Sequence, residues 1–186
     1  KAPSQPVRLF DTPPKFGGTV AELGAHTSDW KYLKSNELRN KEDTSIKPSE
    51  LPLNGLTIID LGMGWAGPLA ARNLADLGAT VIKVEGCVRF DWFRNWEASQ
   101  EWIDDDGAEK AINFIYVNRN KLDVTLDFEQ QAGRELLLKL IGEADAVIEN
   151  YSGGVLPKLK LEYESLKKVN PELVMVSMPA FGSTGP

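Results

Sequence analysis

The sequence has little cysteine, little histidine and no long apolar run. Cys87 and His26 are the only residues of their kinds among 186. A single cysteine excludes an internal disulfide and any metal site made of several cysteines, which fits a reducing cytoplasm. No apolar run approaches the roughly 18 residues that span a bilayer, and the start, 1–4, carries no signal-peptide core. We therefore expect a soluble, cytoplasmic protein without a membrane partner.

Positive charge is also scarce. The chain has 21 Lys and Arg against 27 Asp and Glu, a net charge of −6 at pH 7. Such a chain has no general basic field to hold nucleic acid or an anionic membrane surface, so a phosphate-bearing ligand must be held by local groups. Because 42% of the residues are hydrophobic, a chain of this length can bury a core. We therefore expect one globular domain, with two short ones possible.

The first 50 residues differ from the rest. They are rich in Pro, Gly, Ser and charged residues, and 34–52 has no sustained apolar period, which is typical of a linker. From Leu53 onward short β-rich runs alternate with helical patterns. We expect strands at 56–61, 79–84, 121–126, 146–148 and 173–176, and helices at 67–77, 130–141 and 163–169.

This alternation predicts an α/β fold with a Rossmann-like, doubly wound, mostly parallel sheet. Such sheets bind ligands at the carboxyl ends of their strands. The loops expected there are 62–68, 85–94, 150–154 and 179–186.

The first of these loops contains Gly62-x-Gly64-x-x-Gly67, and Glu85 follows about 20 residues later. A strand, three glycines and a later acid form the dinucleotide-binding fingerprint. Trp65 would compete with a pyrophosphate for space, and Pro68 removes one backbone donor. The loop alone leaves both an NAD or FAD site and a simple tight turn open.

Longer stretches resemble a known family. "LNGLTIIDLGMGWAGPLAARNLADLGATVIKVE", "NRNKLDVTLDF", "GRELLLKLIGEADAVIENY" and "NPELVMVSMPAFGSTGP" occur in this order. Together they resemble the N-terminal half of the large domain of class III CoA transferases, a family that includes formyl-CoA and carnitine CoA transferases and α-methylacyl-CoA racemase. The resemblance implies that 53–186 is a CoA-binding domain, incomplete at its C-terminus, and that the protein forms an interlocked homodimer or pairs tandem modules.

A second resemblance lies in "PVRLFDTPPKFGGTVAELGAHTSDW" at 6–30. It is similar to the C-terminal end of the same family, so 1–33 would be a family tail, followed by the linker 34–52. That order implies an internal piece of a tandem, two-module protein.

The resemblance also implies which residues bind CoA as a co-substrate, and it implies no tightly bound cofactor and no metal. Arg and Lys suit the phosphates of CoA, while apolar walls and backbone groups suit its pantetheine arm. For each residue, solvated surface or packing is the alternative role. Two sequence departures, Gly86 in place of a basic residue and 151–154 in place of F-x-P-G, put exact contacts in doubt. The CoA-binding residues implied are Trp65, Ala66, Arg89, Arg94, Asn118, Lys121, Asn150, Tyr151 and Lys158.

In the family an aspartate attacks an acyl-CoA thioester, giving an acyl-aspartyl anhydride and then an aspartyl-CoA thioester. By resemblance this nucleophile lies beyond Pro186, so no catalytic residue is assigned and the 186-residue chain alone is expected to be inactive. By this route the resemblance implies that CoA is transferred from the acyl-CoA to a small carboxylic acid. Three alternatives stay open: a non-catalytic CoA-binding or assembly module of a tandem protein, an acyl-CoA racemase, and an NAD-dependent oxidoreductase.

Other candidates have plainer explanations. His26 is expected at the surface and Cys87 to be an ordinary thiol, and the acidic run 104–106 favours a solvated turn over a divalent-ion site. Aromatic residues are dense in the polar stretch 86–111. They could pack a lid, or bind an onium substrate by cation–π contact. These aromatic residues are Trp92, Phe93, Trp96 and Trp102.

Overall fold

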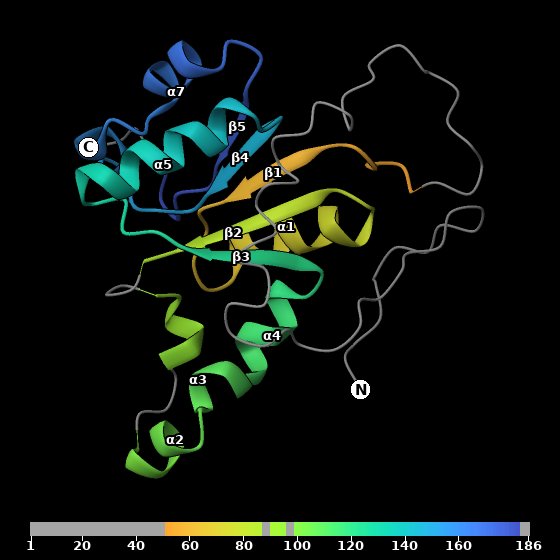
Figure 1. Ribbon diagram of the computed structural model, residues 1–186, viewed down its shortest axis with the longest axis vertical. Coiled ribbons are helices and arrows are strands. Elements are labelled where there is room, and N and C mark those ends of the chain that lie inside the picture. Colours follow the sequence, from red (N-terminus) through yellow and green to blue (C-terminus); the bar gives the residue numbers. More distant parts are fainter. Residues whose placement is uncertain (1–50, 87–89, 96–98, 183–186) are drawn as a thin grey trace.

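The computed structural model describes residues 51–86, 90–95 and 99–182. Within these residues five parallel strands form one sheet in the order β3-β2-β1-β4-β5 (Figure 1). The prediction of a Rossmann-like α/β sheet is confirmed, and every described strand pair is parallel. The strands are β1 (Thr57–Asp60), β2 (Thr80–Glu85), β3 (Lys121–Thr125), β4 (Ala146–Glu149) and β5 (Val174–Ser177).

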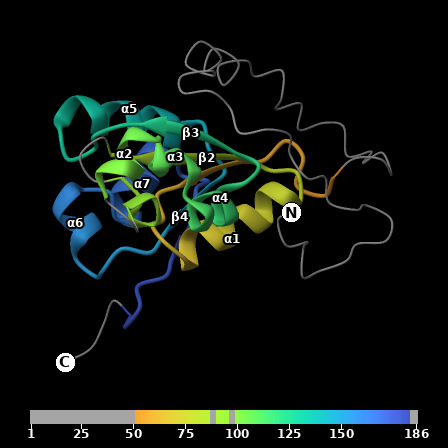
Figure 2. The same cartoon turned by 90° about the horizontal axis from the view of Figure 1, so that it is seen from below.

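Helices cover the two faces of this sheet. The longer ones are α1 (Ala66–Asp76) and α5 (Gln131–Gly142), and Figure 2 shows them on opposite sides of the strands. The chain leaves β1 toward β2 and β3 and later returns to the other side of β1 for β4 and β5. Right-handed crossovers then require the helices to change face. The order reverses between β1 and β4, where doubly wound sheets open a crevice for ligands.

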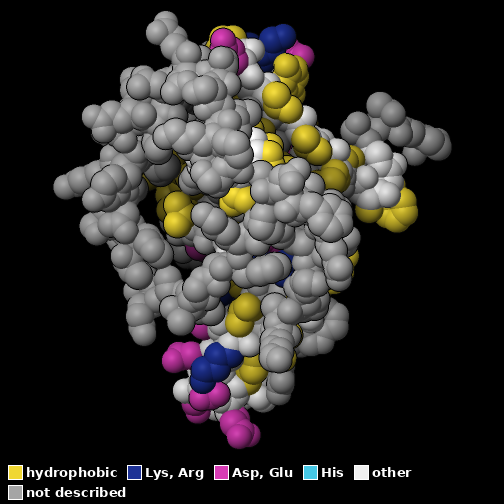
Figure 3. Space-filling model, turned by 90° about the vertical axis from the view of Figure 1, so that its right-hand side faces the viewer, with side chains coloured by type: hydrophobic (Ala, Val, Ile, Leu, Met, Phe, Trp, Pro, Cys, Tyr) yellow, Lys and Arg dark blue, Asp and Glu magenta, His cyan; other side chains and the backbone are white. Residues whose placement is uncertain are grey.

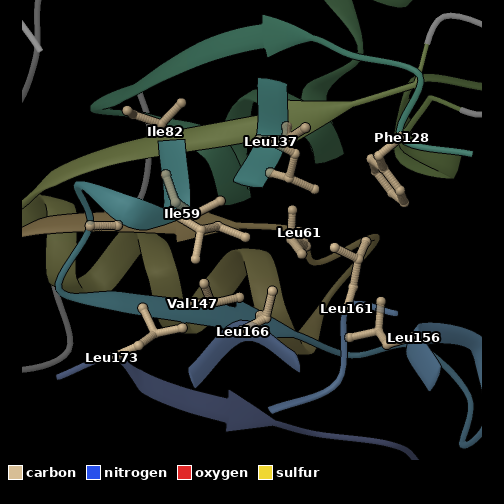
Figure 4. Close-up of a cluster of buried hydrophobic side chains, with 13 residues drawn as sticks. Ile59, Leu61, Ile82, Phe128, Leu137, Val147, Leu156, Leu161, Leu166 and Leu173 are labelled. Carbon is tan, nitrogen blue, oxygen red and sulfur yellow. The ribbon is translucent and has the colours of Figure 1, made fainter. Parts of the chain in front are cut away.

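The larger core lies between the sheet and three helices: α5, α6 (Val155–Leu159) and α7 (Tyr163–Val169). Figure 4 shows its apolar side chains converging from both layers. The fully buried ones include Ile59, Leu61, Leu137, Val147, Leu161 and Leu166.

A smaller core lies on the opposite face. Ile58, Val81 and Ile148 pack there against Ala71 and Ala75 of α1. The strands are therefore apolar on both faces, as expected of a buried parallel sheet.

The connection from β2 to β3 contains short helices that the sequence pattern did not reveal. They are η3 (Trp92–Asn95), α2 (Gln100–Asp104), α3 (Gly107–Lys110) and α4 (Ile112–Asn118). Helices this short depend on tertiary packing rather than on their own periodicity. Here Phe93, Phe114 and Val117 form a local apolar cluster, and the Arg94 guanidinium lies 3.5 Å from the centre of the Phe114 ring.

Acidic and basic side chains gather at the end of the molecule formed by α2 and α3 (Figure 3). The acidic run 104–106 is exposed there, and Asp105 forms an ion pair with Lys110 at 2.7 Å. Within the described residues no cluster of three or more His, Cys, Asp or Glu side chains is arranged to hold a metal ion. None of the helices in the described part of the chain combines the length and apolar character needed to cross a bilayer.

Candidate functional site

The glycine loop joins β1 to α1 at the carboxyl edge of the sheet. Gly64 has a φ of +67°, and a Cβ atom placed on it would lie 1.9 Å from the Trp92 ring. Gly62 and Gly67 touch each other, since a Cβ on either would lie 2.9 Å from the other's Cα. Only glycine fits these three positions. The tight turn predicted from the sequence is therefore present, and its glycines are explained by close packing inside the protein.

Three backbone amides of this loop, those of Gly62, Met63 and Gly64, are occupied by side-chain oxygens from the protein itself. Gly62 N donates to Asp60 Oδ1 at 2.8 Å, Met63 N to Asn150 Oδ1 at 2.7 Å, and Gly64 N to Asp91 Oδ1 at 2.9 Å. In a dinucleotide site such amides would instead be directed at a pyrophosphate. Two of the acceptors are carboxylates, which repel an anion. This geometry argues against the NAD or FAD interpretation.

A buried ion pair lies directly beneath the loop. Lys83 Nζ, on β2, lies 3.0 Å from Asp91 Oδ2, and the side chains are 1% and 0% exposed. The same ammonium also donates to Gly62 O. Burial alone would lower the pKa of Lys83, but the attraction of Asp60, Asp91 and Glu85 outweighs it and raises the pKa above its usual value. The ammonium is therefore charged. Sequence analysis missed both members, although a lysine inside an apolar strand is a usable signal.

A second lysine holds the opposite side of the loop. Lys121 Nζ contacts Asp60 Oδ2 at 2.7 Å, Pro68 O at 2.8 Å and Asn118 Oδ1 at 2.7 Å. Burial lowers the pKa of Lys121 to about 8, although Asp60 opposes this shift. The structure thus brings the predicted site residues Asn118 and Lys121 together, but below the loop. Whether either contacts CoA stays a prediction.

Arg94, another predicted site residue, lies among carboxylates on the β2–β3 side. Its guanidinium is 2.9 Å from Glu85, 3.1 Å from Asp123 and 3.2 Å from Glu109, and the side chain is 12% exposed. Burial and hydrogen bonding to Glu85 raise the pKa of Asp123 to about 8. Burial would raise the pKa of Glu85 too, but hydrogen bonds from Asp123 and Arg94 lower it overall. The raised pKa of Asp123 and the lowered pKa of Glu85 favour Asp123 as the protonated member of this pair, with Arg94 paired to Glu85.

The outer rim of the loop is aromatic. Trp65 is 49% exposed, stacks on Tyr116 with ring centres 5.8 Å apart, and meets Phe93 edge to face at 5.8 Å. Ala66 beside it is also exposed. Trp92 is 48% exposed and packs against both Phe93 and Gly64. In the aromatic stretch, Phe93 therefore packs inside the protein, while Trp92 exposes indole surface to solvent. Trp65 of the loop does the same.

The remaining predicted residues lie on the β4 side. The Asn150 side chain bonds both backbone groups of Met63, accepting from its N–H and donating to its carbonyl at 2.9 Å. Tyr151 packs edge to face on Phe128, and burial raises the pKa of its hydroxyl. Lys158 on α6 is exposed. The predictions for Arg89, Trp96, His26 and Cys87 concern positions outside the described residues.

A separate open pocket of about 360 Å³ lies beside β5. It is lined mainly by apolar groups from α7 and β5 rather than by loop residues. The lining residues are Tyr163, Leu173, Val174, Met175 and Ser177.

Comparison with known proteins gives one consistent family. The model of CoA-transferase family III matches residues 53–186. An acyl-CoA transferase of Fusarium pseudograminearum is 39% identical over 145 residues, which cover 76% of this chain and 32% of that protein. A succinate–glutarate CoA-transferase of Agrobacterium fabrum is 39% identical over 143 residues, covering 77% of this chain and 36% of that protein.

A solved structure agrees with these relatives. A CAIB/BAIF family protein from Brucella suis has a TM-score of 0.65 and 42% identity, over 74% of this chain and 36% of that one. The chain spans about a third of the length of the curated relatives that it matches.

Proposed function

Because the chain belongs to CoA-transferase family III, we propose that it forms the CoA-binding part of an enzyme that moves CoA from an acyl-CoA to a small carboxylic acid. An aspartate outside this chain attacks the thioester carbonyl, releasing CoA thiolate and forming a mixed anhydride. The thiolate then attacks the aspartyl carbonyl, releases the donor carboxylate and leaves an aspartyl-CoA thioester. The acceptor carboxylate reverses these two steps, and the aspartate is regenerated.

One observation supports this function over dinucleotide chemistry. The loop has the shape of a nucleotide-fold turn, but its first three amides, from Gly62 to Gly64, are bonded to Asp60, Asn150 and Asp91. A ligand at this edge therefore meets the exposed rim at Trp65 and Ala66 instead of an anion cradle. An amide-rich pantetheine arm suits such a rim, because it needs apolar walls and few charges.

We propose two kinds of role for the implied residues. Trp65, Ala66, Tyr151 and Lys158 would contact CoA directly, with the exposed Lys158 ammonium directed to its phosphates. Asn118, Lys121 and Asn150 would act through the loop that they hold, and Arg94 through the β2–β3 side. Arg89 remains a proposed phosphate contact.

Calorimetric titration of the 186-residue chain with CoA and with NAD⁺ tests the proposal. We expect saturable heat with CoA and none with NAD⁺. Lys158→Ala should weaken CoA binding by about 5- to 10-fold, because it removes one charge-assisted contact. Lys168→Ala, an exposed lysine on α7, is the matched control and should bind CoA as the parent does. Binding of NAD⁺ in place of CoA would refute the proposal.

We also propose that the enzyme works in the cytoplasm as an interlocked homodimer or a pair of tandem modules. The exposed apolar side chains of β5, Val174 and Val176, support a partner at that edge. Analytical ultracentrifugation of the full-length protein would test this. A full-length protein with a single module that stays monomeric at every concentration would contradict it.

A further inference from the structure

Asp91 receives an unusual set of donors for a loop side chain. Its two oxygens accept from Gly64 N at 2.9 and 3.1 Å, from Phe93 N at 2.9 Å and from Lys83 Nζ at 3.0 Å. The residue is 1% exposed. Backbone amides of a glycine loop together with a lysine ammonium are the donors that nucleotide-binding folds offer to a phosphate group. In this protein one amide of the glycine loop, Gly64 N, and the Lys83 ammonium surround a carboxylate of the same chain.

We propose that the Asp91 carboxylate is an internal anion that fills the anion site of the glycine loop and holds the loop in one shape before any ligand binds. Asp91 is then a positioning residue for the rim at Trp65 and Ala66, not a group that touches substrate. The rim follows Gly64 directly in the chain, so a loop that loses its Asp91 bond moves the rim with it.

Two features close the site to an outside anion. The Trp92 ring covers Gly64 so closely that not even a methyl group fits between them. Asp60, the second carboxylate of the loop, is buried and bonded to Gly62 N and Lys121. An external phosphate would have to displace the Trp92 ring and Asp91 and to approach Asp60. The anion site is therefore built in and permanently occupied.

Chemical rescue with formate, which has the size and charge of the deleted carboxylate, tests the proposal. Thermal unfolding of the parent chain, Asp91→Ala and Asp105→Ala is followed in chloride and in formate at equal ionic strength. Asp105 is the matched control, because it forms an exposed ion pair with Lys110. In chloride we expect Asp91→Ala to melt about 10 °C below the parent, since the buried Lys83 ammonium loses the carboxylate to which it is hydrogen-bonded. Formate should restore at least half of the lost melting temperature in Asp91→Ala. It should change the melting temperatures of the parent chain and of Asp105→Ala by the same small amount. Equal shifts in all three proteins would overturn the proposal.

The positioning role rests on the proposed CoA binding and has its own measurement. CoA affinity should fall several-fold in Asp91→Ala and return with formate, a recovery that a merely unstable variant would not show at a temperature well below its melting point. CoA affinity that stays reduced while formate restores the melting temperature would overturn the positioning role. If the parent chain binds no CoA, the proposed function fails, while the melting curves still decide the internal anion.

Should Asp91→Ala fail to fold in either salt, Asp91→Asn decides the question, because it keeps the volume and loses the charge. Lower stability in Asp91→Asn, partly recovered in Asp91→Asn/Lys83→Met, would support a charge-based role, since the second change removes the ammonium that has lost its bonded carboxylate. An Asp91→Asn protein with the stability of the parent would overturn it.

Discussion

Charged and apolar side chains are buried differently at the β1–β2 part of the sheet and at its β5 edge. On the β1–β2 side, the charged groups of Asp60, Lys83 and Asp91 are buried. On the β5 side, Val174 and Val176 are 59% and 41% exposed. The difference teaches that burial here follows the available partners rather than residue type. A charge is buried where donors and acceptors surround it, and a valine is exposed where no described helix lies over it.

Strand register explains both cases. Lys83 is paired with Asp60 across β1 and β2, so neighbouring strands bring opposite charges together at the edge where the glycine loop begins. Val174 and Val176 are paired with Ala146 and Ile148 of β4, whose side chains lie on the α1 face. Within the described residues α1 packs over β1, β2 and β4, while Val174 and Val176 on the same face of β5 are exposed.

Removing the buried cation should have the largest effect. Lys83→Met leaves the buried carboxylates of Asp91 and Asp60 without the ammonium that attracts both, and the free energy of unfolding should fall by about 3–5 kcal/mol. Urea denaturation measures it. Lys110→Met, which breaks the exposed pair with Asp105, should change the free energy of unfolding by less than about 0.5 kcal/mol. Similar losses in both variants would erase the contrast between buried and exposed charges.

Adding a methyl group to the loop comes next. Gly64→Ala meets both an unfavourable positive φ and the Trp92 ring, so we expect a loss of about 3 kcal/mol. Gly154 also has a positive φ, +86°, but a Cβ there meets open space. Gly154→Ala should therefore lose only about 1 kcal/mol. Equal losses in chemical denaturation would show that packing against Trp92 contributes nothing.

The pH dependence of stability should reveal the shared proton on the β2–β3 side. The pKa of Asp123 is raised to about 8, so between about pH 4 and pH 8 the folded state binds more protons than the unfolded state. This residue's contribution to stability is therefore complete below pH 4 and is lost as the pH rises through 8. Melting temperatures from pH 5 to 8 should fall less steeply in Asp123→Asn than in the parent.

Glu109→Gln is the control for that profile. Glu109 also pairs with Arg94, at 3.2 Å, but its side chain is 52% exposed. Its removal should leave the slope of melting temperature against pH unchanged. A parent slope equal to that of Asp123→Asn would contradict the shared proton.

Polar changes on β5 should have the smallest effect on the chain by itself. Val174→Thr and Val176→Thr put a hydroxyl group at exposed positions, so the free energy of unfolding should change by less than about 0.5 kcal/mol. Val147→Thr, on the neighbouring strand and fully buried, should lose about 2 kcal/mol. Sedimentation velocity at high protein concentration shows whether the β5 variants self-associate more weakly than the parent. Weaker self-association would indicate that a partner binds at this edge.

Local patterns predicted much of this fold because they depend on neighbours in sequence. The apolar runs and the glycine stops gave the five described strands and the helices α1, α5 and α7 close to their observed bounds. The short helices between β2 and β3 were not predictable from periodicity. They depend on contacts such as Arg94 on Phe114, which join residues 20 positions apart.

The candidate site was also predicted only in part from the sequence. Its glycine loop and the residues Trp65, Asn118, Lys121 and Asn150 were named from the sequence, and the structure places them around one turn. Their bonding could not be inferred, because Asn150 and Met63 are 87 residues apart and meet only through the pairing of β1 with β4. Lys83 and Asp91 are only eight residues apart and were overlooked, although a lysine inside an apolar strand is a usable signal.

The sequence by itself determined the family, the alternation of strands and helices, and the turn that needs glycine, since these follow from residue order and local sterics. Only the tertiary structure decided that the amides of Gly62, Met63 and Gly64 are bonded within the protein and that the Asp91 carboxylate lies against the turn. Hydrogen bonds and ion pairs between distant residues depend on strand order and register, which bring together groups that the linear chain keeps apart.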